Sequence, residues 1–154
     1  MKEPNALNKV AEFHSTFKHP IVAAPAIPTP QRCELRVSLL AEELDELKQA
    51  IKDNDMVEIA DALCDLQYVL AGAILEFGLG EKFGDLFGEV HRSNMSKACK
   101  TVEEAEATIA HYKSSSNVDC HYKEIDGLYL VYRDADNKTL KSVNYSAAKL
   151  GGIL

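Results

Sequence analysis

The sequence has 154 residues, of which 46% are hydrophobic and 27% are charged, and its formal net charge is −7 at pH 7. This length and composition indicate one globular domain and argue against a disordered chain. The negative charge argues against a nucleic-acid partner, because a protein that binds nucleic acid needs a basic surface to meet phosphates.

A helix and a proline-rich connection open the predicted fold. Apolar residues recur at intervals of three or four: Leu7, Val10, Phe13 and Phe17. This spacing predicts a helix over residues 6–18. Four of the five prolines fall within residues 19–30, so this stretch is expected to be an extended connection. His14 and His19, which lie near this connection, are expected at the surface, and the alternative is that they line a nucleotide pocket.

A long helical hairpin is predicted next. An apolar stripe predicts a helix over about residues 31–52, and its members are Val37, Leu40, Leu44, Leu47 and Ile51. Residues 53–55 (Asp-Asn-Asp) supply a turn and an N-cap for a second helix that runs to about residue 77. Gly78 and Gly80 are expected to end that helix. Two antiparallel helices joined by a short turn form an αα-hairpin.

Shorter elements are predicted after the hairpin. A helical segment is expected over residues 81–95, and a capping box at residues 101–104 (Thr-Val-Glu-Glu) begins another helix that ends near Tyr112. Aromatic and β-branched residues then predict either a small β-hairpin or a three-stranded meander. Its segments are residues 122–125, 128–133 and 138–143.

The predicted fold class is mainly all-α: an antiparallel helix-hairpin bundle with a small C-terminal β-hairpin. We expect a single domain over residues 1–154, with a helical core over about 1–113 and a β appendage over about 120–145. No apolar run reaches the roughly 18 residues of a membrane-spanning helix, and the first residues lack the apolar stretch of a signal peptide. We therefore expect a cytoplasmic protein with no membrane partner.

Carboxylates gather on one face of the first hairpin helix. At 100° per residue, Glu42, Glu43 and Glu46 lie within about 100° of one another. Leu35 and Leu39 project into the same sector. Because leucines are unusual on a face that meets only water, this face is expected to contact another group.

The second hairpin helix carries Glu58, Asp61 and Asp65 as one acidic stripe, although the helix is otherwise apolar nearly all round. A helix of this kind is normally buried, so we expect the stripe to be at least partly desolvated. No Lys or Arg occurs between Lys52 and Lys82. The hairpin turn and the second helix therefore offer no cation to neutralise buried carboxylates, which are costly to leave unpaired.

Divalent metal ions can supply the missing positive charge. Oxygen ligands without nearby His or Cys suit Mg²⁺, with Mn²⁺ as a possible substitute. Spacings of three residues direct Glu43 and Glu46 on one helix, and Glu58 and Asp61 on the other, toward one point, as in carboxylate-metal bundles. The alternative is a non-catalytic helical module whose acids are solvated or bind the basic surface of a partner.

The acidic segments EELDE (residues 42–46) and EIAD (residues 58–61) resemble the signature of the all-α nucleoside triphosphate pyrophosphohydrolases. This MazG-like group includes dimeric dUTPases and phosphoribosyl-ATP pyrophosphohydrolase. Three further segments are similar to a bacterial and phage subgroup with phosphoribosyl-ATP pyrophosphohydrolase-like domains: EFHSTFKHPI, EVHRSNMSK and VNYSAAKLGGIL. The resemblance implies the all-α NTP pyrophosphatase fold and Mg²⁺-dependent hydrolysis between the α- and β-phosphates, which gives a nucleoside monophosphate and pyrophosphate.

The resemblance also implies roles for individual carboxylates. Glu42 orients the attacking water, deprotonates it, or binds metal itself, and we take Glu42 and Glu43 as the candidate catalytic residues. Asp65 is either a further metal ligand or a carboxylate that supports the ligands. The remaining implied metal ligands, together with Glu43, are Glu46, Glu58 and Asp61.

Residues 91–97 form the clearest basic segment. Arg92 and Lys97 can meet phosphate, and Asn94 can hydrogen-bond to phosphate or to a base; the alternative is a set of surface cations at a helix end. The wide apolar faces of the hairpin favour pairing with another copy, and the resemblance implies a homodimer or homotetramer. We expect a nucleotide substrate, either a nucleoside triphosphate or, ranked second, phosphoribosyl-ATP. The chain has no P-loop motif.

Overall fold

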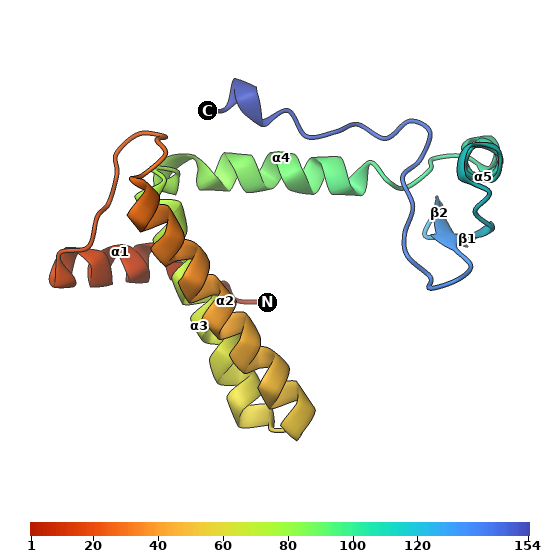
Figure 1. Cartoon of the computed structure of the whole chain (residues 1–154). Helices are drawn as coiled ribbons and strands as arrows, with labels where there is room; N and C mark the ends of the chain where they lie inside the picture. Colours follow the sequence, from red (N-terminus) through yellow and green to blue (C-terminus); the bar gives the residue numbers. More distant parts are fainter. The chain divides into compact units, whose positions relative to one another are not determined.

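The computed structural model describes residues 1–154 as five α-helices, two short 3₁₀ turns and a two-stranded sheet (Figure 1). The elements are α1 (Ala6–Phe17), α2 (Pro30–Asp53), α3 (Met56–Glu76), η1 (Gly80–Lys82), α4 (Phe83–Met95), α5 (Val102–Ser116), β1 (Cys120–Ile125), β2 (Leu128–Arg133) and η2 (Leu150–Gly152). This architecture confirms the mainly all-α fold class with a small C-terminal β-hairpin.

Contacts between residues divide the chain into two compact units, Met1–Phe83 and Gly84–Leu154. This division groups nearly all of α4, and α5, with the β-hairpin. A single domain over residues 1–154, with a helical core to about residue 113, stays a prediction. Each unit has its own small core.

The first unit is the predicted hairpin with α1 packed on it. Helices α2 and α3 run side by side (Figure 1). Val10 of α1 is buried against Ala71 and Leu75 of α3. The Asp55 side chain begins α3 as its N-cap, because it accepts hydrogen bonds from the N–H groups of Val57 (2.9 Å) and Glu58 (3.2 Å).

The proline-rich connection between α1 and α2 pairs its backbone with the end of α3. The N–H of Val22 donates to the carbonyl of Leu75 (3.0 Å), and the N–H of Ala26 donates to that of Phe77 (3.1 Å). Gly78 has φ +68°, and a Cβ there would lie 2.0 Å from the carbonyl oxygen of Ala24. Only glycine fits this position, so the predicted helix-ending role of Gly78 is confirmed.

The second unit contains α4, α5 and the hairpin, with Val131 of β2 buried against Cys99 and Ala105. Helix α5 continues to Ser116, beyond the predicted end at Tyr112, and ends where Asn117 adopts φ 50°. The three-stranded meander is wrong and the two-stranded hairpin is correct. Residues 138–143 form only an isolated bridge between Thr139 and Tyr132, because few of their backbone groups reach β2.

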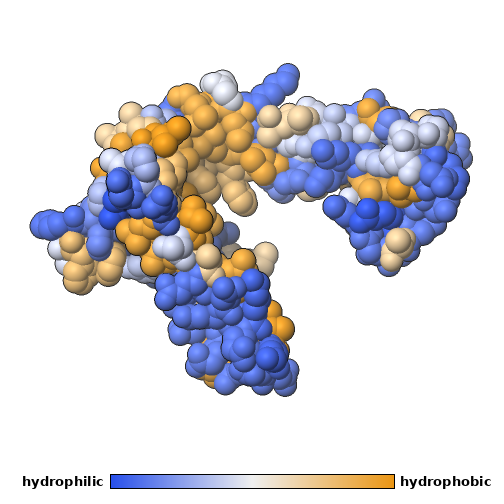
Figure 2. Space-filling model, in the orientation of Figure 1, coloured by the Kyte–Doolittle hydropathy of each residue, from blue (hydrophilic) through white to orange (hydrophobic).

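Large apolar side chains of the hairpin remain exposed in the single chain. Val37, Leu44 and Ile51 of the predicted stripe on α2 are 67%, 44% and 59% exposed. Five large hydrophobic residues of α3 are also exposed: Met56, Val57, Leu63, Tyr68 and Leu70. Figure 2 shows hydrophilic residues over the turn end of the α2–α3 hairpin.

No single helix is both long and apolar enough to cross a membrane. One bent pair of helices, α3 with the segment Gly80–Met95, has the length and the apolar composition of a membrane span.

Candidate active site

The structure brings the predicted carboxylates onto the α2–α3 hairpin. Helix α2 carries Glu42, Glu43 and Glu46, and α3 carries the other three: Glu58, Asp61 and Asp65. Because the two helices run antiparallel, the acids of α2 near the turn lie opposite the first turns of α3. Glu46 and Glu58 line one surface hollow of about 260 Å³ near the turn, together with Asp53 and Asp55.

Glu43 is the electrostatic centre of this group, which we call the acidic cluster. The Glu43 residue is half-buried. Burial and the negative charge of four neighbouring carboxylates raise the pKa of Glu43 above its ordinary value of 4.5. These neighbours, in decreasing order of effect, are Glu46, Asp65, Glu42 and Asp61. Acids from both helices therefore lie close enough to disfavour ionisation of Glu43.

No Lys, Arg or His forms an ion pair with any member of the acidic cluster. The expected desolvation of the α3 stripe is found only in part, since Asp65 is half-buried whereas Glu58 and Asp61 are exposed in the single chain. Several large side chains of α3 around them are also exposed in the single chain. The cluster is thus a concentration of negative charge without protein compensation.

The donor chemistry of the acidic cluster fits a hard divalent cation. All six side chains offer carboxylate oxygens, and no His or Cys is among them, which matches the preference of Mg²⁺ for oxygen ligands. As the side chains stand, no three His, Cys, Asp or Glu residues are close enough together to hold one metal ion. The cluster therefore has the right charge and ligand type, with its side chains spread along the facing helices.

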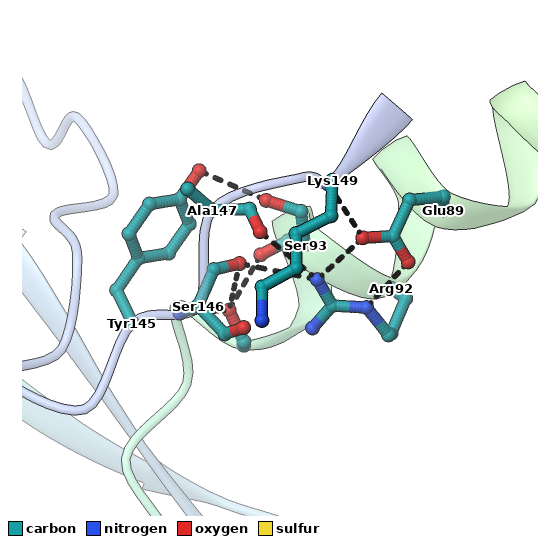
Figure 3. Close-up of polar contacts among 8 residues, drawn as sticks. Glu89, Arg92, Ser93, Tyr145, Ser146, Ala147 and Lys149 are labelled. Atoms are coloured by element: carbon teal, nitrogen blue, oxygen red, sulfur yellow. Dashed lines mark hydrogen bonds and ion pairs between the residues drawn. The ribbon is translucent and has the colours of Figure 1, made fainter. Parts of the chain in front are cut away.

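The three basic-segment candidates lie in the second unit, on α4 and just after it. The Arg92 guanidinium pairs with Glu89 through Nε (2.7 Å) and also donates to the carbonyl oxygens of Ser146 and Ala147 (3.4 and 3.2 Å), as Figure 3 shows. Arg92 thus fastens the C-terminal segment to α4. Lys97 Nζ donates to Asn94 Oδ1 (2.7 Å).

The same network holds the C-terminal segment at two further points (Figure 3). The Lys149 N–H donates to Glu89 (2.8 Å), and the hydroxyl groups of Ser93 and Tyr145 are 2.9 Å apart. The hydrogen bond from Arg92 and that from the Lys149 backbone lower the pKa of Glu89 to about 2. Glu89 is therefore ionised throughout the physiological range, and it anchors both partners.

A second polar group, which sequence reasoning missed, lies at the other end of the hairpin. Glu76 is fully buried at the end of α3, and its carboxylate accepts hydrogen bonds from Arg32 and Arg36 of α2. Burial alone raises the pKa of Glu76, but the hydrogen bonds from the two guanidinium groups outweigh burial and lower it. The signal in the sequence is weak, because Arg36 and Glu76 are 40 residues apart.

His14 belongs to this second group, so its expected surface position is wrong. It is only 2% exposed, because α1 packs this face against the hairpin. The carbonyl of Pro20 accepts a hydrogen bond from Nδ1 (2.8 Å), and Nε2 lies 3.4 Å from the Arg36 guanidinium. Burial is the main cause that lowers the pKa of His14 below 6.5. His19 is exposed, as expected.

Comparisons with known proteins agree with this arrangement. The family model described as phosphoribosyl-ATP pyrophosphohydrolase matches residues 10–94, which is more than half of the chain and includes the whole acidic cluster. The chain is also 26% identical to a protein of Acanthamoeba polyphaga mimivirus described as uncharacterized, over 94% of each chain. The protein therefore belongs to the phosphoribosyl-ATP pyrophosphohydrolase family, within the MazG-like all-α pyrophosphohydrolases.

Proposed function

We propose that this pyrophosphohydrolase is a Mg²⁺-dependent enzyme that cleaves a nucleoside triphosphate between its α- and β-phosphates. The products are a nucleoside monophosphate and pyrophosphate. The observation that carries the proposal is the acidic cluster, in which carboxylates from two helices raise the pKa of Glu43 and meet no protein cation. A polyphosphate anion can approach such a surface only with cations that balance both charges.

Individual side chains take distinct roles in this proposal. When bound, Mg²⁺ would supply positive charge to the phosphates and would lower the pKa of the attacking water. Glu42 accepts a proton from that water as its oxygen bonds to phosphorus, and the bridging oxygen leaves with the pyrophosphate. The proposed metal ligands are Glu43, Glu46, Glu58 and Asp61, with Asp65 as either a fifth ligand or a support for the others.

Phosphoribosyl-ATP is the second candidate substrate. The description of the matching family favours it, and it contains the same bond between α- and β-phosphates. The C-terminal unit is the reason for ranking it second, since α5 and the β-hairpin lie beyond residues 10–94 that the family model covers. Arg92, Asn94 and Lys97 stay predicted substrate-binding residues for either substrate, with Arg92 and Lys97 to meet phosphate and Asn94 to meet phosphate or the base.

A second copy of the chain is the proposed partner of the exposed apolar face. Val37, Leu44 and Ile51 lie on the side of α2 away from the acids. Their exposure leaves an apolar stripe in contact with water, which is unfavourable. Pairing of two copies buries this stripe without any other protein.

Light scattering after gel filtration should give the mass of a dimer or a tetramer for the wild type, and the mass of a monomer for Leu44→Lys. A wild-type monomer at micromolar concentration contradicts this part.

The activity is tested with a panel of canonical and modified nucleoside triphosphates plus phosphoribosyl-ATP, assayed for pyrophosphate release with Mg²⁺ and with EDTA. We expect release of pyrophosphate from at least one nucleoside triphosphate, and none in EDTA. Release from phosphoribosyl-ATP alone selects the second candidate. Turnover that persists in EDTA contradicts the metal-dependent mechanism.

A further inference from the structure

A cavity of about 230 Å³ lies within the first unit, next to the acidic cluster. Residues from α1, α2, α3 and the connection line it, among them Leu39 and Val69. Leu39 precedes Glu43 by four residues, and Val69 follows Asp65 by four. One helical turn, or about 6 Å of rise, therefore separates the cavity from the carboxylates on both helices. The leucines predicted to share the sector of the acids, Leu35 and Leu39, are the ones that line this cavity.

The rim of the cavity is aromatic. The rings of Phe13 and His19 stack with centroids 5.7 Å apart and an interplanar angle of 17°. Phe13 meets Tyr68 edge to face at 5.6 Å and 83°. The remaining walls near them are aliphatic. Flat aromatic surfaces of this kind bind planar rings, because every nucleobase has a π-face that can stack.

Two arginines of α2, Arg32 and Arg36, line the end of the cavity nearest Glu76. The Arg36 side chain is 8% exposed, and its Nη2 makes the guanidinium's hydrogen bonds, to Glu76 and His14. Its Nε is buried without a partner. Arg32, also in the lining, keeps 31% of its side chain exposed. Two guanidinium groups face one carboxylate here, so donors outnumber acceptors at this end.

The acceptors at this end are already engaged. Glu76 is held by both arginines, and His14 donates through Nδ1 to Pro20, which leaves its Nε2 as an acceptor that faces Arg36. A Cβ at Gly72 would lie 2.7 Å from Arg36 Nη1 and 3.1 Å from His14 Nε2. A side chain at position 72 would therefore clash with the Arg36 guanidinium, and glycine avoids this clash. A ligand that enters must bring an acceptor.

We propose that this cavity holds the base of the nucleotide substrate and selects a base that presents a carbonyl oxygen to Arg32 and Arg36, as uracil and guanine do. The inference rests on the proposed function, because the phosphates are taken to lie at the acidic cluster. At about 230 Å³ the cavity is smaller than the roughly 300–1,000 Å³ of sites for whole drug-sized ligands. It therefore accepts a base and leaves the sugar and phosphates outside, toward Glu43.

Base selectivity is tested on the unmodified protein by calorimetry with the non-hydrolysable α,β-methylene triphosphates of uridine, guanosine and adenosine, all with Mg²⁺. We expect the uridine or the guanosine analogue to bind at least tenfold more tightly than the adenosine analogue, whose base has no carbonyl oxygen. Equal affinities, or tighter binding of the adenosine analogue, overturn the proposal.

The position of the base is tested with two matched phenylalanine variants. Phe13→Leu removes the aromatic surface at the rim, whereas Phe87→Leu makes the same change at an exposed residue of α4, outside the cavity. Phe13→Leu should weaken binding of the preferred analogue at least fivefold, in line with the loss of one stacking partner. Phe87→Leu should leave it unchanged. Equal effects of the two substitutions overturn the assignment.

Inorganic tripolyphosphate separates this inference from the proposed function. With Mg²⁺ it should bind the wild type and Phe13→Leu equally, because it has no base. If tripolyphosphate binds but Phe13→Leu does not change the affinity for the nucleotide analogues, the base cavity is refuted and the metal site stands. If tripolyphosphate fails to bind while uridine or guanosine binds in a manner sensitive to Phe13→Leu, the cavity stands and the proposed function fails.

Discussion

Two groups of acids on the same helix pair have opposite electrostatics. At one end, Glu76 is fully buried, yet hydrogen bonds from Arg32 and Arg36 outweigh the effect of burial and lower its pKa. Near the middle, Glu43 is only half-buried, yet burial and neighbouring acids raise its pKa. The difference lies in the partners, since cations face the first group and only further carboxylates face the second.

This contrast separates stability from function. An acid that the chain itself compensates strengthens the fold, because its charge is used in native hydrogen bonds. A group of acids without a compensating cation lowers the stability of the fold. Such a group is therefore a candidate binding site for a ligand of opposite charge. On this account Glu76 belongs to the framework of the first unit, and the acidic cluster belongs to the chemistry.

The largest expected effect is the loss of turnover on neutralising a ligand of the acidic cluster. Glu46→Gln and Asp61→Asn should each lower the rate of pyrophosphate release by more than about a hundredfold, because an isosteric amide keeps the shape but removes the charge that holds Mg²⁺. Circular dichroism should show unchanged helix content. Asp45→Asn is the matched control, since Asp45 is exposed and pairs only with Lys48. Turnover preserved in both variants rules out the assigned ligands.

The next effect is on stability at the compensated end. Glu76→Gln should lower the free energy of unfolding by about 3–5 kcal/mol, because it leaves buried Arg36 without its counter-charge. Urea denaturation measures it, with the exposed Glu34→Gln on α2 as control. A loss below about 1 kcal/mol, equal to that of the control, would show that the Glu76 network contributes little.

Acidification should lower the stability of the region around His14 and Glu76 in two stages. The pKa of His14 is lowered from 6.5, mainly by burial, so its neutral form contributes stability above pH 6.5 that is lost as pH falls through the lowered pKa. The pKa of Glu76 is lowered from 4.5, so its contribution is lost only at more acidic pH, below 4.5. Melting temperatures between pH 4 and pH 8 should therefore fall less steeply for His14→Gln than for the wild type just below pH 6.5. Parallel curves would contradict the role of His14.

The smallest effect has the opposite sign. In EDTA, Glu43→Gln should raise the free energy of unfolding by a few tenths of a kcal/mol, because it relieves repulsion among like charges. With saturating Mg²⁺ the wild type should gain more stability than the variant, since binding stabilises the folded state by mass action. If Glu43→Gln instead lowered the free energy of unfolding in EDTA, Glu43 would stabilise the fold as Glu76 does, and the contrast between the two groups of acids would be contradicted.

Periodic features of this fold could be predicted from sequence, because they depend on residues close together in the chain. Helices α2 and α3 were predicted to within about one residue at each end, since their apolar spacing, the Asp55 cap and Gly78 are local signals. The common face of Glu42, Glu43 and Glu46 follows from the same spacing. Which cations reach a given acid depends on helix packing and could not be predicted.

The features that sequence analysis missed are those with distant partners. Glu76 and Arg36 are 40 residues apart, and His14 is buried only because α1 packs beside that pair. Residues 138–143 have the composition of a strand but make only one bridge to β2, at Tyr132 and Thr139. Strand formation needs a row of partners, which composition does not specify.

The central claim is most directly tested by calorimetric titration of Mn²⁺ and Mg²⁺ into the metal-free protein, with and without a non-hydrolysable nucleoside triphosphate. The account predicts saturable binding to the wild type, binding lost or much weakened in Glu46→Gln and Asp61→Asn, and binding unchanged in Asp45→Asn. The absence of metal binding to the wild type under both conditions would contradict it and leave a helical module with a solvated acidic face.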